Sequence, residues 1–228
     1  MRLKWWYIFP AIVVLLGILA WWMWPRYQES RIDPNELLDQ SLKNTAAALS
    51  FKYNLNSSLV VEGRREVISR VEGEKSKDGN IHIKGEMVKT PVDIYHIDGT
   101  IYNKDAFSKK WLVIKDVQSN STKVLISELD PLSNFNFKSI GEIQRTGWER
   151  VDGNRCALVC CKPSVENELM EILWQDFTYK IWIDSDEKVV RKATLSAVSK
   201  NSPKTYLQMQ VTFKDFNKRI TVEKPKID

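Results

Sequence analysis

The sequence lacks the residue patterns by which catalytic and cofactor sites are usually recognised. It has two histidines, His82 and His96, and no acidic or cysteine cluster lies near either one along the chain. No serine has the flanking glycines of a nucleophile elbow, and no glycine-rich loop is placed to hold a phosphate. Asp184 and Asp186 fall in an expected turn without the spacing of a calcium loop. We therefore predict a protein without enzymatic activity, cofactor or metal, with both histidines structural or solvent-facing.

Cysteine is scarce and confined to one short run that contains Cys156, Cys160 and Cys161. If this run is a strand, Cys156 and Cys160 share a face but lie about 13 Å apart, which is beyond the reach of a disulfide. Cys160 and Cys161 then point to opposite faces. We expect buried free thiols, and the alternative is a bridge between two molecules. Lipid attachment through a cysteine after the first apolar run is excluded, because no cysteine is found there.

An excess of charge of one sign is also missing from most of the chain. The formal net charge is +5, but residues 1–27 carry Arg2, Lys4 and Arg26 and no acidic residue. The remainder is close to neutral, with acidic and basic side chains interspersed. Such a surface gives no reason to expect nucleic acid as a partner.

What the sequence does contain is one long uncharged run, residues 5–24. A helix of about twenty residues rises about 30 Å, the thickness of the hydrocarbon core of a bilayer. Aromatic residues close both ends, as expected at the two headgroup layers; they are Trp5, Trp6, Tyr7, Trp21, Trp22 and Trp24. Arg2 and Lys4 precede the run. We predict a single-pass anchor in the cell membrane with a cytoplasmic amino terminus and an extracytoplasmic domain.

A cleaved signal peptide is the alternative interpretation of this segment. The sequence Ile18-Leu19-Ala20 offers a weak cleavage site, but the mature chain would then begin with a cluster of tryptophans. We favour an anchor over residues 1–27, a linker over 28–33 and one extracytoplasmic domain over 34–228. Because six or seven extended residues reach only about 20 Å, the domain should lie close to the membrane.

Hydrophobic periodicity in the domain predicts a helix followed mainly by strands. Asp33 and Pro34 suit the cap and the first position of a helix. The apolar residues then recur every second position from residue 51 to 61, which is typical of a strand. About six strands are expected by residue 115. Further strands are expected around 142–150, 155–162, 179–183, 189–198 and 207–213, and further helices over 121–138 and 163–174.

These elements predict a single α+β domain with a curved antiparallel half-barrel of about ten strands wrapped over helices. Each strand has one apolar face, so one side of the sheet must be covered, and a cavity can form at the mouth of such a sheet. An ordinary packed core would have the same pattern. The candidate lining of an apolar ligand site is the inward set Phe51, Tyr53, Leu55, Ile81, Ile83, Met87, Ile181, Ile183, Leu207, Met209, Val211 and Phe213.

Three segments carry a resemblance to a known group: the helix and long strand over 33–61, the hairpin over 95–102 with Trp111 after it, and the run over 179–195. In that last run a strand ends at Trp182, turns at Asp184 and leads to a basic residue at Arg191. Over roughly residues 33–216 the chain resembles the LolA/LppX/LprG-like superfamily of bacterial envelope proteins, which carry lipids or lipoproteins.

The resemblance implies a binding protein that accepts a lipid, or the acyl chain of a lipidated protein, in its half-barrel. Carriers of this kind are typically free in the periplasm or anchored by lipid, so an expected transmembrane helix is a departure from the pattern. A fixed domain suits a scaffold better than a shuttle. The alternative function is therefore a non-catalytic interaction or sensor module that holds an envelope enzyme or a membrane regulator.

Overall fold

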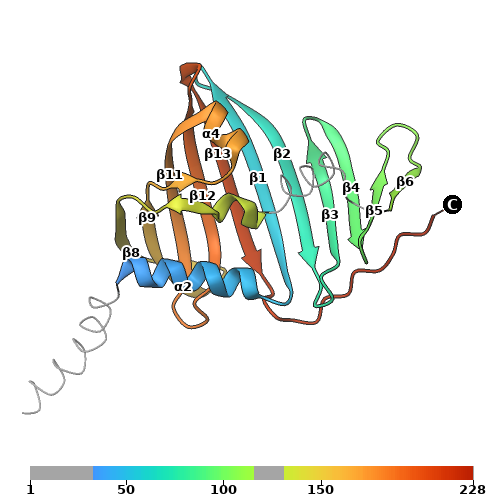
Figure 1. The fold of residues 1–228 in the computed structure, drawn as a ribbon, viewed down its shortest axis with the longest axis horizontal. Coiled ribbons are helices and arrows are strands. Elements are labelled where there is room, and N and C mark those ends of the chain that lie inside the picture. The colour runs from blue at the N-terminus through green and yellow to red at the C-terminus, as the bar shows by residue number, and fades with distance from the viewer. Residues whose placement is uncertain (1–32, 116–130, 228) are drawn as a thin grey trace, which may run out of the picture.

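The computed structural model describes residues 33–115 and 131–227 (Figure 1). The first of these two segments is a helix followed by a meander of six strands. Its elements are α2 (Pro34–Ala47), β1 (Phe51–Val61), β2 (Arg64–Lys75), β3 (Ile81–Met87), β4 (Thr90–Ile97), β5 (Thr100–Lys104) and β6 (Trp111–Ile114).

The second segment begins with short elements and ends with the longest strands. Its elements are the 3-10 helix η1 (Pro131–Phe135), β7 (Phe137–Ser139), β8 (Ile143–Val151), β9 (Asn154–Cys161), β10 (Ser164–Val165), α4 (Glu168–Leu173), β11 (Trp174–Asp184), β12 (Val190–Ser199) and β13 (Ser202–Lys214).

Eleven strands form one antiparallel sheet in the order β6-β5-β4-β3-β2-β1-β13-β12-β11-β9-β8. The sheet is curved and open, because β6 and β8 are its two edges. Strands β7 and β10 form a separate two-stranded pair that lies with α2, η1 and α4 over one face of the large sheet (Figure 1). The predicted α+β class and open antiparallel sheet are confirmed, with one strand more than the ten expected.

Helix α2 begins as its sequence predicts. Oδ1 of Asp33 accepts a hydrogen bond from the amide of Asn35 at 2.8 Å, and Pro34 takes the first helical position. Leu38 and Thr45 are buried against the sheet, and Oγ1 of Thr45 accepts from the amide of Val190 at 2.9 Å. The helix ends at Ala47, so Leu49 lies beyond it and is exposed. The helical spacing of Leu38, Leu42, Thr45 and Leu49 predicts one continuous buried face, and for Leu49 this prediction is wrong.

The core lies on the covered face of the sheet, where the alternate residues of the long strands meet. Strand β1 pairs with β13 so that Tyr53 lies opposite Phe213 and Leu55 opposite Val211. On its other side β1 pairs with β2, and the Tyr53 ring covers the backbone of Gly73. A side chain at Gly73 would collide with that ring, so the close approach requires glycine.

Two of the expected helices are shorter than the sequence indicated. Over 163–174 the chain first forms β10, which pairs with β7, and only residues 168–173 are helical, capped by the Asn167 side chain. Of the helix expected over 121–138, residues 121–130 lie outside the described part. The rest is η1, which buries Phe135, and β7, whose Phe137 packs against the same core.

The predicted anchor, residues 5–24, also lies outside the described residues. Within 33–115 and 131–227, neither helix is long and apolar enough to cross a membrane. Membrane anchoring stays a prediction from the sequence.

Candidate functional site

The structure brings the predicted inward residues together in one hydrophobic core. Nine of them are buried, while Ile81, Met87 and Met209 are partly buried and pack against the same cluster. The buried ones are Phe51, Tyr53, Leu55, Ile83, Ile181, Ile183, Leu207, Val211 and Phe213. Periodicity therefore identified the covered face of the sheet.

Aromatic side chains from η1 and β7 fill much of that covered face. The ring centre of Phe135 lies 6.3 Å from that of Phe213 and 6.4 Å from that of Tyr179. Phe137 meets Tyr179 edge to face at 5.0 Å, and the Tyr179 hydroxyl donates to the carbonyl of Asn134 at 2.8 Å. Burial raises the pKa of Tyr179, so this hydroxyl stays protonated.

A small cavity remains beneath η1, bordered by Leu55, Met209 and Val211 of the predicted set. Its volume is about 20 Å³, enough for a single water molecule. The predicted lining set is thus close-packed in the described part of the chain, and its role in ligand binding stays a prediction.

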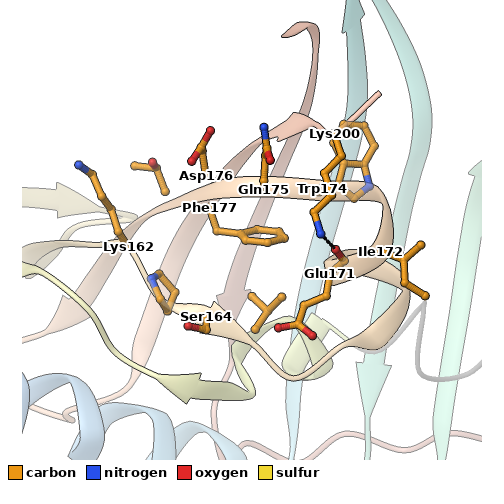
Figure 2. A pocket seen from close by; sticks show the side chains of 12 residues that line it. Lys162, Ser164, Glu171, Ile172, Trp174, Gln175, Asp176, Phe177 and Lys200 are labelled. Atoms are coloured by element: carbon orange, nitrogen blue, oxygen red, sulfur yellow. Dashed lines mark hydrogen bonds between the residues drawn. The ribbon is translucent and has the colours of Figure 1, made fainter. Parts of the chain in front are cut away.

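A much larger cavity, about 1070 Å³, lies at the start of β11. Figure 2 shows Phe177 directed into the space between β11 and the β10 segment, whereas Gln175 and Asp176 point to the other side of the strand. Apolar groups form much of its wall: Pro163, Val165, Ile172, Trp174 and Phe177. Lys162, Glu171 and Lys200 add charged groups. An apolar wall with a few polar groups is the usual composition of a ligand pocket.

An irregularity in β11 borders this cavity. The pairing of β11 with β12 shifts register between Gln175 and Thr178, and Asp176 adopts a φ of 55°. Phe177 keeps the inward alternation of Tyr179 and Ile181, with only 8 % of its surface exposed, and the extra residue leaves Gln175 and Asp176 both exposed. Bulges of this kind redirect side chains and often occur next to functional sites.

Polar contacts hold α4 against the end of the sheet and so fix one side of the cavity. Nζ of Lys200 donates to the carbonyl of Glu171 (Figure 2), and the Lys200 amide donates to the carbonyl of Leu173 at 3.0 Å. Nζ of Lys138 lies 2.6 Å from Oε2 of Glu171. None of the predicted lining residues borders this cavity. The sequence feature that indicated this region was the apolar pattern over 163–174. Two of its residues border the cavity, Val165 on β10 and Ile172 on α4.

A second hollow, about 540 Å³, lies on the opposite, polar face of the sheet. It is bordered by Arg65, Arg70 and Lys180 together with amide and hydroxyl side chains such as Gln208 and Thr194. Met209 is the one predicted lining residue that reaches it. Its polar wall does not suit an acyl chain.

The structure also places acidic groups beside His82, which sequence reasoning missed. Nε2 of His82 lies 3.0 Å from Oδ1 of Asp93, and Nδ1 lies 3.8 Å from Oε1 of Glu74. The ring stacks on Tyr95 at 3.9 Å, and burial together with the charges of Asp93 and Glu74 raises the pKa of Tyr95. His82 is on β3, Glu74 is on β2, and Asp93 and Tyr95 are on β4. Because β2 and β4 flank β3 in the sheet, these neighbours of His82 become apparent only from the register of strand pairing. Within the described ranges, no set of three or more histidine, cysteine or acidic side chains is placed to hold a metal.

Comparison with solved structures finds chains that are similar to this one. The lipoprotein LppX of Mycobacterium tuberculosis matches with a TM-score of 0.58 and 16% identity, over 84% of this chain and 100% of that one. LprF of Mycobacterium bovis matches with a TM-score of 0.49 and 11% identity, over 83% and 95%. A LolA superfamily protein of Nitrosomonas europaea gives 0.37 and 9%, over 84% and 96%.

No family model matches the sequence, and no curated protein matches it either. At these identities the likeness to LppX concerns the fold alone. The resemblance inferred from the sequence is confirmed at that level: the chain has a LolA/LppX/LprG-like fold.

Proposed function

We propose that this chain is a membrane-tethered, extracytoplasmic binding protein that accepts an acyl chain of a lipid or of a lipidated protein. The observation that carries the proposal is the cavity of about 1070 Å³ at the start of β11. Its volume is slightly above the range typical of small-molecule sites, roughly 300–1,000 Å³. The proposal contains no catalytic step.

The chemistry of the cavity wall supports an amphipathic ligand. Val165 and Phe177 are buried behind it, so an acyl chain would lie against apolar surface that is already formed. Lys162 and Lys200 border the same space and would suit an anionic or carbonyl-bearing headgroup. The fold that the chain shares with the lipoprotein LppX, and the resemblance of its sequence to envelope lipid carriers, support this class of ligand.

The test is photocrosslinking of the full-length protein in bacteria fed a clickable, photoactivatable fatty acid. Trypsin should release the cavity segment as peptide 156–180, because Lys162 precedes a proline and cleavage there is inhibited. We expect this peptide to carry the label. The apolar segment 5–24, if it lies in the bilayer, should be labelled too and serves as an internal reference.

A pair of adjacent variants provides the control. Ile172→Asp places a charge on the cavity wall, and Leu173→Asp places one on a neighbouring exposed side chain that does not border the cavity. Labelling of peptide 156–180 relative to 5–24 should be lost in Ile172→Asp and retained in Leu173→Asp. Equal labelling in both variants, or label confined to the anchor segment, would contradict acyl-chain binding here.

The tether is tested separately by topology. The domain should be degraded when protease is added to intact spheroplasts, because the positive residues ahead of the run favour a cytoplasmic amino terminus. Protection of the domain would overturn this orientation. Recovery of a mature chain that begins at Trp21 would show a cleaved signal peptide instead of an anchor.

A second candidate function is a non-catalytic interaction or sensor module for an envelope enzyme or membrane regulator. The packing of Phe135 and Phe137 over the covered face favours it, since that face then has little room for a ligand. Under this alternative, crosslinking in cells should capture a defined protein partner and peptide 156–180 should carry no fatty acid.

A further inference from the structure

The two ends of the large sheet differ in the side chains that they expose. Antiparallel pairing places the turns β1–β2, β3–β4, β5–β6 and β12–β13 at one end of the sheet and the remaining hairpin turns at the other (Figure 1). We call the first of these the apolar end. Large exposed apolar side chains on its turns, the adjoining strands and α4 are Val61, Val67, Val88, Phe107, Ile172, Leu173 and Tyr206, whereas Leu49, Val113 and Ile114 are exposed nearer the other end.

The charges of the two ends differ as well. At the apolar end the exposed residues in and beside the turns are mainly lysines and arginines, namely Arg64, Arg65, Lys89, Lys109, Lys110 and Lys200, with Glu62, Glu66 and Glu86 among them. At the other end, which we call the acidic end, the turns carry more acids than bases: the acids are Asp78, Asp98, Asp152, Asp186 and Glu187, and the bases are Lys77 and Lys188. Exposed apolar tips among basic residues are the combination that binds an interfacial region of anionic lipid.

The β5–β6 turn presents the most exposed of these apolar side chains. Phe107 is 91 % exposed, so the fold itself gains little from this ring. The turn is nevertheless ordered: Oδ1 of Asp105 accepts from the amides of Phe107 at 3.2 Å and Ser108 at 2.6 Å. The amide of Lys109 donates to the Asp105 carbonyl at 3.0 Å. A phenylalanine is thus held at the tip of a rigid turn between basic residues.

The cavity described above opens at this same end. Ile172 and Lys200 border the cavity and also belong to the apolar end, where the amide of Lys200 is bonded to the carbonyl of Leu173. Helix α2 lies near the opposite end (Figure 1), where Nδ2 of Asn44 donates to the carbonyl of Lys188 at 3.0 Å. A surface docked through the apolar end would therefore face the cavity and not α2.

We infer that the apolar end docks on the surface of an anionic lipid bilayer, with Phe107 and Val88 entering the interfacial region and the surrounding lysines and arginines contacting headgroups. Docking of this kind depends on the turns alone and does not require a ligand in the cavity. It therefore stands or falls independently of acyl-chain binding, although it would place the cavity at a source of lipid.

Site-specific fluorescence on the full-length protein tests the inference. The protein is reconstituted in vesicles of phosphatidylcholine with phosphatidylglycerol, with an NBD label on Phe107→Cys or, as the control at the acidic end, on Asp78→Cys. Background from the native cysteines is measured on the unsubstituted chain. The experiment is done in two arms. In one arm the brominated lipid is in the vesicles that hold the reconstituted protein, and in the other it is in separate vesicles that are added afterwards, so that quenching identifies which bilayer the label contacts.

Emission from position 107 should shift to the blue and be quenched by brominated lipid in one of the two arms, and emission from position 78 should not. Quenching should weaken in neutral vesicles and be lost when Val88→Asp is added to Phe107→Cys, while fatty-acid labelling of peptide 156–180 persists at the cavity. Emission at 107 that is unquenched in both arms, or quenched no more than at 78, would overturn the inference. Equal quenching in neutral and anionic vesicles would overturn the role given to the basic residues.

Discussion

Nε of Arg191 lies 2.8 Å from Oδ2 of Asp184, and both side chains are buried at the turn between β11 and β12. The other carboxylate oxygen accepts hydrogen bonds from the amides of Asp186 at 2.9 Å and Glu187 at 3.1 Å. The guanidinium also contacts the Glu187 carboxylate at 2.8 Å and lies over the Phe216 ring. Asp184 and Arg191, two of the residues that carried the resemblance, thus form a satisfied buried ion pair whose role is structural.

We predict that Arg191→Leu strongly destabilises the protein, because it leaves the Asp184 carboxylate buried without its cation. Breaking a buried pair from one side costs about 3–5 kcal/mol, whereas replacing both partners costs far less. The free energy of unfolding in urea should therefore be higher for Arg191→Leu combined with Asp184→Asn than for Arg191→Leu alone. A double variant that is no more stable than the single one would contradict this account.

The same pair predicts a loss of stability in acid. Burial alone would raise the pKa of Asp184, but the amides of Asp186 and Glu187 and the Arg191 guanidinium outweigh it and hold the pKa below its ordinary value of 3.8. A lowered folded-state pKa contributes stability above the unfolded value and loses it as the pH falls, here between about pH 5 and pH 2. The urea midpoint should fall more over this range in the wild type than in Asp184→Asn. Parallel curves would show that Asp184 is not responsible.

Much of the fold can be predicted from local sequence, because its strands are long and their apolar and polar residues alternate regularly. The bounds of β1 and the cap at Asp33 agree with the pattern, since an alternating face and a capping side chain are read within a few residues. The segment over 163–174 behaves differently. Its apolar spacing suits a helix, but β10 pairs with β7, and Oγ of Ser164 lies 3.0 Å from Oγ of Ser139. A contact between residues so far apart in sequence is not visible in local periodicity.

The candidate site is less predictable than the fold for the same reason. Alternation identified Leu55, Met209 and Val211 as inward, but it could not distinguish a packed core from a hollow one. The large cavity lies beside a bulge at Asp176 and beside α4, which Lys200 holds at the end of the sheet, and both features depend on contacts between separate elements. The acidic neighbours of His82 likewise become apparent only once the register is known.

The three cysteines should differ in reactivity. Burial and the nearby Asp184 charge raise the pKa of Cys156 to about 11, and burial, with Cys160 adding to it, raises the pKa of Cys161 to about 12. Both thiols are therefore protonated and inaccessible at pH 8, whereas Cys160 is partly exposed, with Sγ 3.7 Å from Oγ1 of Thr146. Native protein should react with a maleimide at Cys160 alone, and all three thiols should react in urea.

Two comparisons check this assignment. Cys160→Ser should abolish maleimide labelling of the native protein. The additional labelling in urea, which comes from Cys156 and Cys161, should not change. All three cysteines are free in the structure, so the purified protein should run as a monomer on a non-reducing gel. A dimer that disappears in Cys160→Ser would instead support the bridge between molecules.

Phe135 and Phe107 provide a matched test of whether η1 is part of the core. Phe135 is 9 % exposed and packs against Tyr179 and Phe213, whereas Phe107 is 91 % exposed. Truncation of a buried phenylalanine to alanine costs about 3–5 kcal/mol, and a surface substitution changes stability by about 0.5 kcal/mol or less. Urea unfolding of Phe135→Ala should therefore show a large loss and Phe107→Ala almost none. Equal and small effects would mean that η1 packs loosely over the sheet, which would leave room for a ligand at Leu55 and Val211.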